Sequence, residues 1–470
     1  MLTRRDALLI ASLCAACSSL SGRSLGDASF DGSDAYVDAS QTEDRAAPAD
    51  RVSPASDAST CPRGTSPVID SRAFGIIMEP APHPFSSAIV RSAAIDAQGR
   101  VYGVGYVEYP PGSRRSRASV WRFRATNLTL DETWGEGGIS MDSDASATGL
   151  YWLAATIDAS GRLVAAGVAG DDVRASALIV RYTEDGRPDA TFGAGGRTLV
   201  PPSRLRGSVS AVRPFGIHQD ADGIIVAAGD GSPPSGPSRR GIALRLSPDG
   251  ALVESFGTSG AFTTSTLYGC FDVERDGDAY VFACISEDDR PALLRLDARG
   301  EPVTTFGADG VSIHEMAPRG FQTRALERDS AGRWLVGGAV SPFYDDTSSA
   351  PAAVRFLADG TPDETWGDRG VASAPGVRQT FAYAFAQSFR VTCDDRLMFG
   401  AAAGVLALIG GFDREGHRMV SFGEDGYIRG PTSPGTDVAV IALLAVPGSA
   451  DLVMVGSLSG PGAAFARVLQ

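Results

Sequence analysis

Residues 177–193 read ALIVRYTEDGRPDATFG, and residues 352–367 read AAVRFLADGTPDETWG. Both segments contain an apolar strand, an Asp-Gly turn, and an aromatic residue followed by glycine. Asp-Gly next to an apolar run is a hairpin signal, because glycine accepts the positive φ that a tight turn requires. The same succession of features in two distant segments indicates that the chain is built from repeats.

The aromatic-glycine element recurs along the whole chain, at intervals of 60, 58, 64, 50, 60 and 56 residues. Its aromatic residues are Phe74, Trp134, Phe192, Phe256, Phe306, Trp366 and Phe422. A period of about 58 residues suits a propeller blade of four strands with its loops. Because they recur once per repeat, these aromatic side chains are expected to pack between neighbouring sheets.

The two ends of the chain each carry part of one repeat. The last apolar strand, residues 464–469, has no aromatic-glycine element after it, and the missing element stands near the other end as Phe74-Gly75. A closed ring explains this division, because the N-terminal strand then joins the C-terminal blade and removes the free edges. The sequence therefore predicts an all-β fold at residues 63–470, a seven-bladed β-propeller, with six or eight blades as the alternatives.

The first 17 residues are typical of an export signal. Arg4 and Arg5 precede a short apolar stretch, which resembles a twin-arginine signal. Small residues before Cys17 resemble a bacterial lipoprotein cleavage box, so we expect Cys17 to be lipidated, with ordinary signal-peptidase cleavage as the alternative. This predicts a protein of the cell envelope, anchored at the outer membrane or in the periplasm, with the cell surface as a further option.

Residues 18–62 are rich in Ser, Ala, Asp and Pro and have few large apolar side chains. Such a segment buries too little apolar surface to offset the entropy lost on ordering, so it is predicted to be a disordered acidic linker. The whole chain has a net charge of −14. This charge argues against nucleic acid as a partner, because phosphates require a basic surface. We expect a monomer attached to the membrane through its lipid.

The four cysteines after Cys17 suggest disulfide bonds, which an exported protein can form. Cys270 and Cys284 flank a predicted hairpin that turns at Asp276-Gly277, which places them nearly opposite each other on two strands. We therefore predict a disulfide between them. Cys61 and Cys393 are the two that remain.

These motifs resemble the delta-60 repeat family of bacterial exported proteins. The matching features are the Arg-Leu/Phe strand, the Asp-Gly turn and an Asp-x-Thr-Phe/Trp-Gly element, as at residues 189–193 and 363–367. The resemblance covers residues 70–470, although residues 254–256 and 420–422 lack the aspartate. It implies a structural repeat and brings no catalytic residues with it.

The search for reactive motifs predicts no catalytic residue, no cofactor and no metal site. The histidines, His83, His218, His314 and His417, lie in separate repeats, and no pair has the spacing of metal ligands. No nucleophile elbow and no glycine-rich phosphate loop occurs. Carboxylates are abundant, so a hydrolase or lyase site assembled from several blades stays an alternative.

Loops on a rigid scaffold usually carry binding, so the face with the variable loops, around the mouth of the central channel, is the candidate surface. Less periodic aromatic residues near the starts of the inner strands could form a stacking platform there, with buried packing as the alternative: Tyr151, Trp152, Phe215, Tyr268, Phe321, Phe381 and Tyr383. The leading hypothesis is a non-enzymatic module that binds a glycan, peptide or protein. The alternatives are a propeller-type polysaccharide lyase or glycosidase and a purely structural envelope component.

Overall fold

The computed structural model describes residues 68–77, 88–108, 116–142, 149–170, 174–205, 209–229, 240–340, 350–375, 388–403, 406–429, 438–458 and 463–469. The predicted export signal, Cys17 and the whole predicted linker lie outside these residues. The described part consists of 28 strands and one short 3-10 helix, η2 (Pro202–Arg204), and belongs to one compact unit. None of its helices is long and apolar enough to cross a membrane. The all-β, propeller-like fold is thereby confirmed.

The strands follow one another in runs of four that pair antiparallel. The first strand of each run, called an inner strand below, is β2 (Ala88–Ile95), β6 (Leu150–Ile157), β10 (Arg213–Asp220), β14 (Leu267–Asp276), β18 (Phe321–Arg328), β22 (Ser388–Val391) or β26 (Val438–Ala445). The second strands are β3 (Val101–Glu108), β7 (Leu163–Ala169), β11 (Gly223–Gly229), β15 (Ala279–Ser286), β19 (Trp334–Val340), β23 (Leu397–Ala403) and β27 (Leu452–Leu458). They begin directly after the polar hairpin turns that the sequence shows.

The outer half of each run contains the repeated apolar strand and a short last strand. The third strands are β4 (Ser116–Phe123), β8 (Ser176–Arg181), β12 (Gly241–Leu246), β16 (Pro291–Leu296), β20 (Ala350–Phe356), β24 (Leu406–Phe412) and β28 (Ala463–Leu469). The fourth are β5 (Ile139–Met141), β9 (Arg197–Val200), β13 (Ala261–Thr264), β17 (Val311–Ile313), β21 (Val371–Ser373) and β25 (Ile428–Arg429). In the last run, β1 (Val68–Ile77) takes the fourth place by pairing antiparallel with β28.

These strands form five sheets of four strands and one sheet of eight. The eight-stranded sheet contains the two runs β10–β13 and β14–β17, which are joined by a pairing of Gly229 in β11 with Gly269 in β14. The sheet of the last run has the order β1-β28-β27-β26, so the two ends of the chain meet in it, as the division of the repeat predicts.

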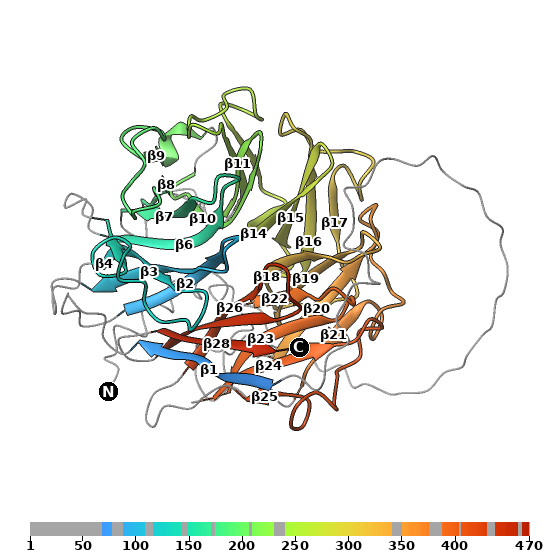
Figure 1. The fold of residues 1–470 in the computed structure, drawn as a ribbon. Coiled ribbons are helices and arrows are strands. Elements are labelled where there is room, and N and C mark those ends of the chain that lie inside the picture. Colours follow the sequence, from blue (N-terminus) through green and yellow to red (C-terminus); the bar gives the residue numbers. More distant parts are fainter. Residues whose placement is uncertain are drawn as a thin grey trace, which may run out of the picture. The chain divides into compact units, whose positions relative to one another are not determined.

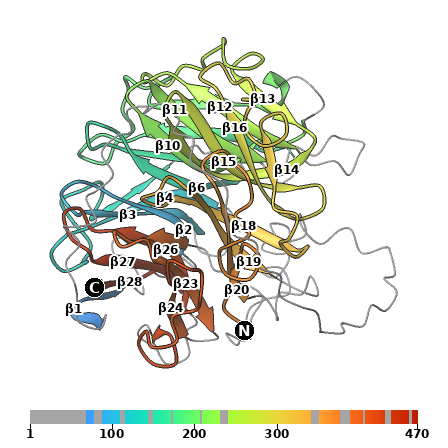
Figure 2. The same cartoon turned by 90° about the vertical axis from the view of Figure 1, so that its right-hand side faces the viewer.

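The inner strands contact one another in sequence order. β2 contacts β6, and the succession continues through β10, β14, β18, β22 and β26. β26 in turn contacts β2, so the contacts between inner strands run in a closed circle. Figure 1 shows these strands in order, and Figure 2 shows β26 beside both β2 and β23.

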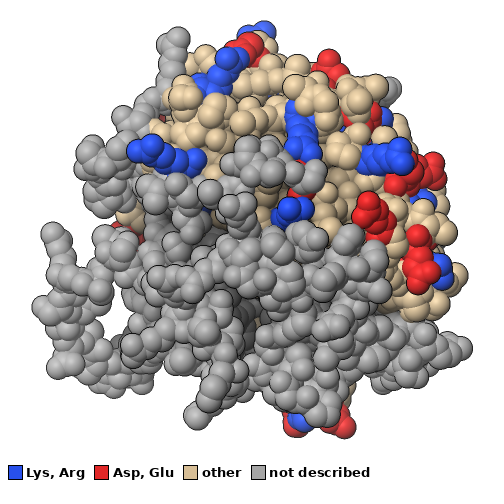
Figure 3. Space-filling view, turned by 90° about the vertical axis from the view of Figure 1, so that its left-hand side faces the viewer, with Lys and Arg blue, Asp and Glu red and all other residues tan. Residues whose placement is uncertain are grey.

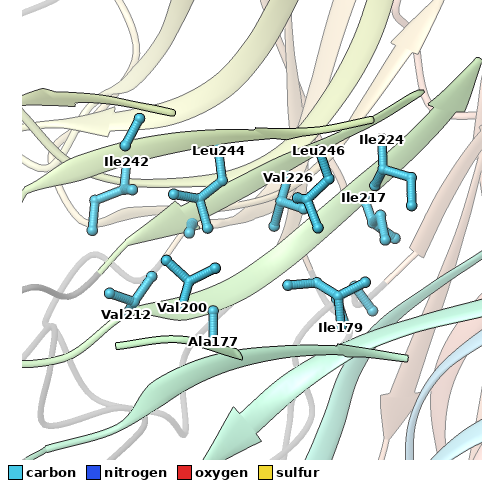
Figure 4. Close-up of a cluster of buried hydrophobic side chains, with 14 of the residues drawn as sticks. Ala177, Ile179, Val200, Val212, Ile217, Ile224, Val226, Ile242, Leu244 and Leu246 are labelled. Atoms are coloured by element: carbon cyan, nitrogen blue, oxygen red, sulfur yellow. The ribbon is translucent and has the colours of Figure 1, made fainter. Parts of the chain in front are cut away.

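The hydrophobic core lies between neighbouring sheets. One cluster combines Ala177, Ile179 and Val200 of the β6–β9 sheet with side chains of β10, β11 and β12, and Figure 4 shows the two layers facing each other. A corresponding cluster packs residues of β26 and β27 against those of β2, β3 and β4. Alternating apolar residues on both faces of a strand therefore contact the sheet before and the sheet after it.

The repeated motifs hold adjacent sheets together. The turn glycine Gly250 has φ +85°, and a Cβ there would lie 2.8 Å from the ring of Phe192 in the preceding sheet. The backbone N–H of Gly193 donates to the carbonyl of Asp249 in the same turn. Gly186 lies against Trp134 in the same way. The Asp-Gly turn and the aromatic-glycine element are thus two halves of one contact between repeats.

An arginine of the third strand reinforces this contact. Arg181 Nε donates to Asp189 Oδ2 at 2.8 Å, and its Nη1 donates to the carbonyl of Pro248 in the next repeat at 2.7 Å. The guanidinium also lies over the ring of Phe192, 4.8 Å from its centroid. Because the same arrangement recurs at Arg122 and Arg355, the Arg, Asp and aromatic residues of the repeat have a structural role.

Candidate functional site

Six of the inner strands contain a β-bulge at the same place. In β10, for example, Pro214 pairs with Ala228 and Gly216 with Ala227, which leaves Phe215 without a partner. A bulge bends its strand and redirects the extra side chain. The six extra residues are Arg91, Leu153, Phe215, Phe271, Arg324 and Ile441, and we call them the bulge ring. The equivalent position of β22, residue 387, lies outside the described residues.

A glycine on the second strand explains how the bulge is accommodated. At Gly167, which pairs with Trp152 beside the bulge of β6, a Cβ would lie 2.1 Å from the carbonyl oxygen of Tyr151. Gly105 and Gly338 stand in the same relation to β2 and β18. In β3, β7 and β19 this glycine is a sequence signal that could have located the bulge, whereas β11 and β15 have Ala228 and Cys284 at the same place.

The bulge ring contains an aromatic stack. Phe215 and Phe271 have their ring centroids 5.0 Å apart and their planes inclined by 26°. The guanidinium of Arg324 lies over Phe271, 5.5 Å from its centroid. The three residues come from the successive inner strands β10, β14 and β18, and all three are half-buried. They form a solvent-accessible arc that ends in a cation.

Arg91 supplies a second cation to the bulge ring. Its guanidinium lies over Tyr106, 5.8 Å from the centroid, and Tyr106 contacts Tyr151 edge to face. The Nε of Arg91 is buried and has no hydrogen-bond partner among the described residues. A buried N–H without an acceptor costs roughly 1–3 kcal/mol, so this guanidinium is suited to an acceptor from a ligand.

A group of ionisable side chains lies three residues further along the same strands. His218, Glu274, Glu327 and Arg390 occupy equivalent positions of β10, β14, β18 and β22, as their pairing partners on the second strands show. The other inner strands have Ala94, Thr156 and Leu444 there. Three residues of a strand span about 10 Å. We call His218, Asp272, Glu274, Glu327 and Arg390 the carboxylate cluster.

Two carboxylates of this cluster join neighbouring inner strands. Asp272 Oδ2 accepts a hydrogen bond from the backbone N–H of Leu326 in β18 at 2.9 Å. Glu327 accepts one from the backbone N–H of Val391 in β22 at 3.0 Å and one from Arg390 Nη1 at 3.2 Å. Both residues thus satisfy edge N–H groups of the next inner strand, which is a structural role. Glu274 has His218 Nδ1 at 3.6 Å and keeps 42% of its side chain exposed.

The surroundings of the cluster favour the neutral form of its acids. Burial among the inner strands, with negative neighbours, raises the pKa of Asp272 to about 7 and that of Glu274 to about 8. Burial also raises the pKa of Glu327, whereas it lowers the pKa of His218. The carboxylate of Glu327 raises the pKa of Arg390. At neutral pH the cluster therefore carries fewer negative charges than its three carboxyl groups allow.

The described residues contain no group of three or more His, Cys, Asp or Glu side chains that could hold a metal ion. The carboxylate cluster thus differs from a metal centre, because two of its carboxylates already accept backbone hydrogen bonds. On the face drawn in Figure 3, basic and acidic residues are interspersed over the described surface.

The predicted stacking platform is only partly present. Phe215 belongs to the bulge ring, and Tyr151 and Tyr268 are half-buried. Trp152 and Phe321, with exposed fractions of 0% and 1%, lie in the core between sheets, so the platform does not include them. Trp152 directly precedes the bulge residue Leu153, and Phe321 lies three residues before the bulge residue Arg324. Phe381 and Tyr383 lie outside the described residues.

The remaining predicted residues have clear positions where the structure describes them. Trp134, Phe192, Phe256, Phe306, Trp366 and Phe422 are buried, and Phe74 pairs through its backbone with Ala466. Cys270 and Cys284 form a disulfide at opposite positions of β14 and β15. Cys393 is also disulfide-bonded, whereas Cys61 lies outside the described residues. Sequence reasoning missed Phe271, Arg91, Arg324 and the carboxylate cluster.

Two segments of the chain, residues 159–192 and 332–365, match the model of a beta-propeller domain of unknown function, DUF5122. Each segment runs from the hairpin turn between the first two strands of a run to the aromatic element or just before it. The match supports the propeller-like fold. A comparison with curated proteins finds no match.

Solved structures similar to this chain include proteins whose names indicate unlike roles. Chaetomium thermophilum Sqt1, bound to the N-terminus of ribosomal protein L10, has 15% identity and a TM-score of 0.44, over 82% of this chain and 86% of its own. A catalytically inactive virginiamycin B lyase from Staphylococcus aureus with quinupristin has 9% identity and a TM-score of 0.44, over 84% and 99%. The GH74 xyloglucanase from Xanthomonas campestris has 13% identity and a TM-score of 0.45, over 83% and 53%. Likeness at this level implies nothing about function.

Proposed function

We propose that this protein is a non-enzymatic binding module of the cell envelope that holds its ligand at the bulge ring. The observation that carries the proposal is the arc of Phe215, Phe271 and Arg324 on three successive inner strands. A fold held only by packing between sheets has no need of half-buried stacked rings and a cation at the redirected position of a bulge. Ligand sites commonly combine an apolar surface with a few polar groups.

The proposal includes the closed architecture. The eight-stranded sheet contains two runs of four that meet at Gly229 and Gly269. We count each run as one blade, so the proposed architecture has seven blades of delta-60-like repeats around one axis. The bulge ring lies in the first half of most inner strands, toward the variable loops. A ligand then enters the mouth of the central channel from the variable-loop face, and the inner strands provide the rigid support for binding.

The location proposed for the protein rests on the first 17 residues. Lipidation of Cys17 and the following linker would attach a monomeric propeller to a membrane. The test is Cys17→Ala expressed in a bacterial host that processes lipoproteins. We expect the wild type to partition into detergent and the variant into the aqueous phase. Equal partitioning of the two would refute the anchor and leave the binding site untouched.

The binding function is tested with a panel of envelope glycans and peptides. We expect the purified protein to bind one class, and Phe215→Ala with Phe271→Ala to weaken that binding by about tenfold or more, because stacked aromatic surface is lost. Val420→Ala is the matched control, since Val420 is 66% exposed and belongs to no part of the bulge ring. A ligand whose affinity is equal for the double variant and the control would exclude this site.

One observation favours a second candidate, a polysaccharide lyase or glycosidase. Burial raises the pKa of Glu274 to about 8, and Glu327 lies near it with Arg390 as its partner. A protonated acid near an ionised carboxylate is the combination that acid-base hydrolysis uses. The ligand found in the panel would be incubated with the protein, and reducing ends and unsaturated products measured. Products that disappear with Glu274→Gln, at unchanged ligand affinity, would favour the enzyme over the binding module.

A further inference from the structure

The bulge ring carries two guanidinium groups and no acid. Arg91 and Arg324 come from β2 and β18, and the other four members are aliphatic or aromatic. Arg91 has no ion pair and no hydrogen bond among the described residues. Elsewhere the described arginines of the repeat are mostly paired, as Arg122, Arg181 and Arg355 are with aspartates of their own repeat. A guanidinium left over an aromatic ring at a redirected position is available to an anionic group.

The carboxylate cluster does not neutralise Arg91. Glu274 and Glu327 lie about 10 Å further along the strands, and Glu327 is engaged with Arg390. Asp272, which directly follows Phe271, accepts a hydrogen bond from the backbone N–H of Leu326. Burial raises the pKa of Glu274 to about 8. Arg91 therefore stays without an acidic partner among the described residues, although the whole chain has a net charge of −14.

The same residues are suited to a polyhydroxylated molecule. A protonated carboxyl group donates one hydrogen bond and accepts others, and 42% of the Glu274 side chain is exposed. The half-buried ring of Phe215 presents an apolar surface in the bulge ring, about 10 Å away along the strands. Aromatic rings can stack on the C–H face of a sugar, carboxyl groups can bind its hydroxyls, and arginine can bind a carboxylate. A ligand that uses all three is an acidic saccharide. A peptide would make fewer hydrogen bonds to these carboxyl groups, because most of its donors are backbone groups.

We propose that the bulge ring binds a uronic acid unit of an oligosaccharide, with its carboxylate on Arg91 and a sugar face on Phe215. This inference rests on the proposed binding function and specifies its ligand class. The anionic group distinguishes it from recognition of a neutral glycan. The sugar ring distinguishes it from recognition of an acidic peptide.

The test uses the purified full chain and isothermal titration with named probes. These are trisaccharides of galacturonate, of mannuronate and of guluronate, the neutral galactotriose, and a hexaglutamate peptide. We expect one uronate trisaccharide to bind, and galactotriose and hexaglutamate to bind at least tenfold more weakly. Added salt should weaken the binding of the uronate trisaccharide. Arg91→Gln should weaken uronate binding about tenfold, since the variant loses a charge-assisted hydrogen bond to the carboxylate.

Arg187→Gln is the matched control, because it removes the same charge from a side chain that is 84% exposed on a turn. Arg91→Lys, which keeps the charge, and an unchanged melting temperature separate a lost contact from a lost fold. Equal binding of galactotriose, or an unchanged affinity in Arg91→Gln, would overturn the acidic class. Binding of hexaglutamate in place of every uronate would overturn the saccharide.

The failure of this inference can be told apart from failure of the proposed function. If no uronate binds but another ligand of the panel loses affinity in the Phe215 and Phe271 variant, the uronate proposal is wrong and the site stands. If no ligand of any class depends on the bulge ring, both are wrong.

Discussion

Phe215 and Phe271 stack with their ring centroids 5.0 Å apart, although 56 residues separate them in the chain. They meet because each is the extra residue of a bulge, in two inner strands that contact each other. Gly216 permits this approach, since a Cβ there would lie 2.6 Å from the Cα of Asp272. The stack thus depends on two bulges, one glycine and the contact of two sheets.

The stack should be energetically coupled. We expect Phe215→Leu and Phe271→Leu to destabilise the protein less together than the sum of the two single effects, with a coupling of about 0.5–1.5 kcal/mol. The measurement is a double-mutant cycle in urea unfolding. Strictly additive effects would mean that the rings do not interact in solution.

The stability of the protein should fall as the pH rises through 7 and 8. The folded-state pKa values of Asp272 and Glu274, about 7 and about 8, lie above the ordinary values of 3.8 and 4.5. A raised pKa means that the folded state holds the proton more tightly. This contribution is fully present below about pH 4 and is lost as the pH rises through the folded values.

Glu274→Gln should remove much of this loss of stability at alkaline pH. Melting temperatures measured between pH 5 and pH 9 would show the effect. Glu184→Gln is the control, because that side chain is 87% exposed. A variant with the same pH profile as the wild type would show that Glu274 does not titrate in this range.

A second pH effect should appear on the acid side. His314 is completely buried beside Phe356, and neither ring nitrogen has a hydrogen-bond partner among the described residues. Burial lowers its pKa from 6.5 to about 4. Because the folded value lies below the unfolded one, the neutral histidine stabilises the protein above pH 6.5, and this stability is lost toward pH 4.

For a pKa shift of this size, the free energy of unfolding decreases by on the order of 3 kcal/mol. We expect His314→Phe to flatten the decline in unfolding free energy between pH 6.5 and pH 4, measured by urea titration. A decline as steep as that of the wild type would place the acid sensitivity elsewhere.

The turn glycines should differ sharply in their tolerance of alanine. At Gly250, φ is +85° and a Cβ would meet the ring of Phe192 at 2.8 Å, whereas at Gly277 φ is +62° and nothing lies within 4 Å. Gly277→Ala should lower the free energy of unfolding only by the strain of the positive φ, roughly 1 kcal/mol. Gly250→Ala should cost clearly more, on the order of 3 kcal/mol, because the overlap is added to the strain. Equal melting temperatures for the two variants would contradict the contact between repeats.

Deletion of residues 462–470 should abolish cooperative unfolding. The deletion removes β28, which lies between β1 and β27 and pairs with both. β1 then has no partner and β27 becomes a free edge. Calorimetry would show a broadened transition at lower temperature. Deletion of nine residues at 31–39, in the predicted linker, is the control and should leave the transition unchanged.

Much of the fold could be predicted from single residues of the repeat. The Asp-Gly turn at Gly250 and the aromatic residue at Phe192 were each recognisable, because positive φ and one large apolar side chain per repeat leave a local trace. Their contact was not, since it joins two repeats. The disulfide between Cys270 and Cys284 could be predicted because a hairpin relates two positions by their distance from the turn.

The candidate site was largely hidden from this reasoning. Trp152 and Phe321 satisfied the same description as Phe215, an aromatic residue near the start of an inner strand, yet they lie in the core. A bulge shifts the register by one residue and reverses which side chain faces the neighbouring sheet. Alternating apolar residues do not reveal that shift. A glycine opposite the bulge, such as Gly167, marks it in some strands, but Ala228 and Cys284 stand at that place beside the bulges of Phe215 and Phe271.

The sequence by itself determined the repeats, their hairpin turns and the joining of the two chain ends in one sheet, because each depends on local geometry or on a motif split between the termini. Only the tertiary structure decided that Phe215, Phe271, Arg324 and Arg91 belong to one ring and that Glu274 and Glu327 lie in one cluster. The physical reason is that these side chains meet through the closed circle of inner strands, where residues more than fifty positions apart become neighbours.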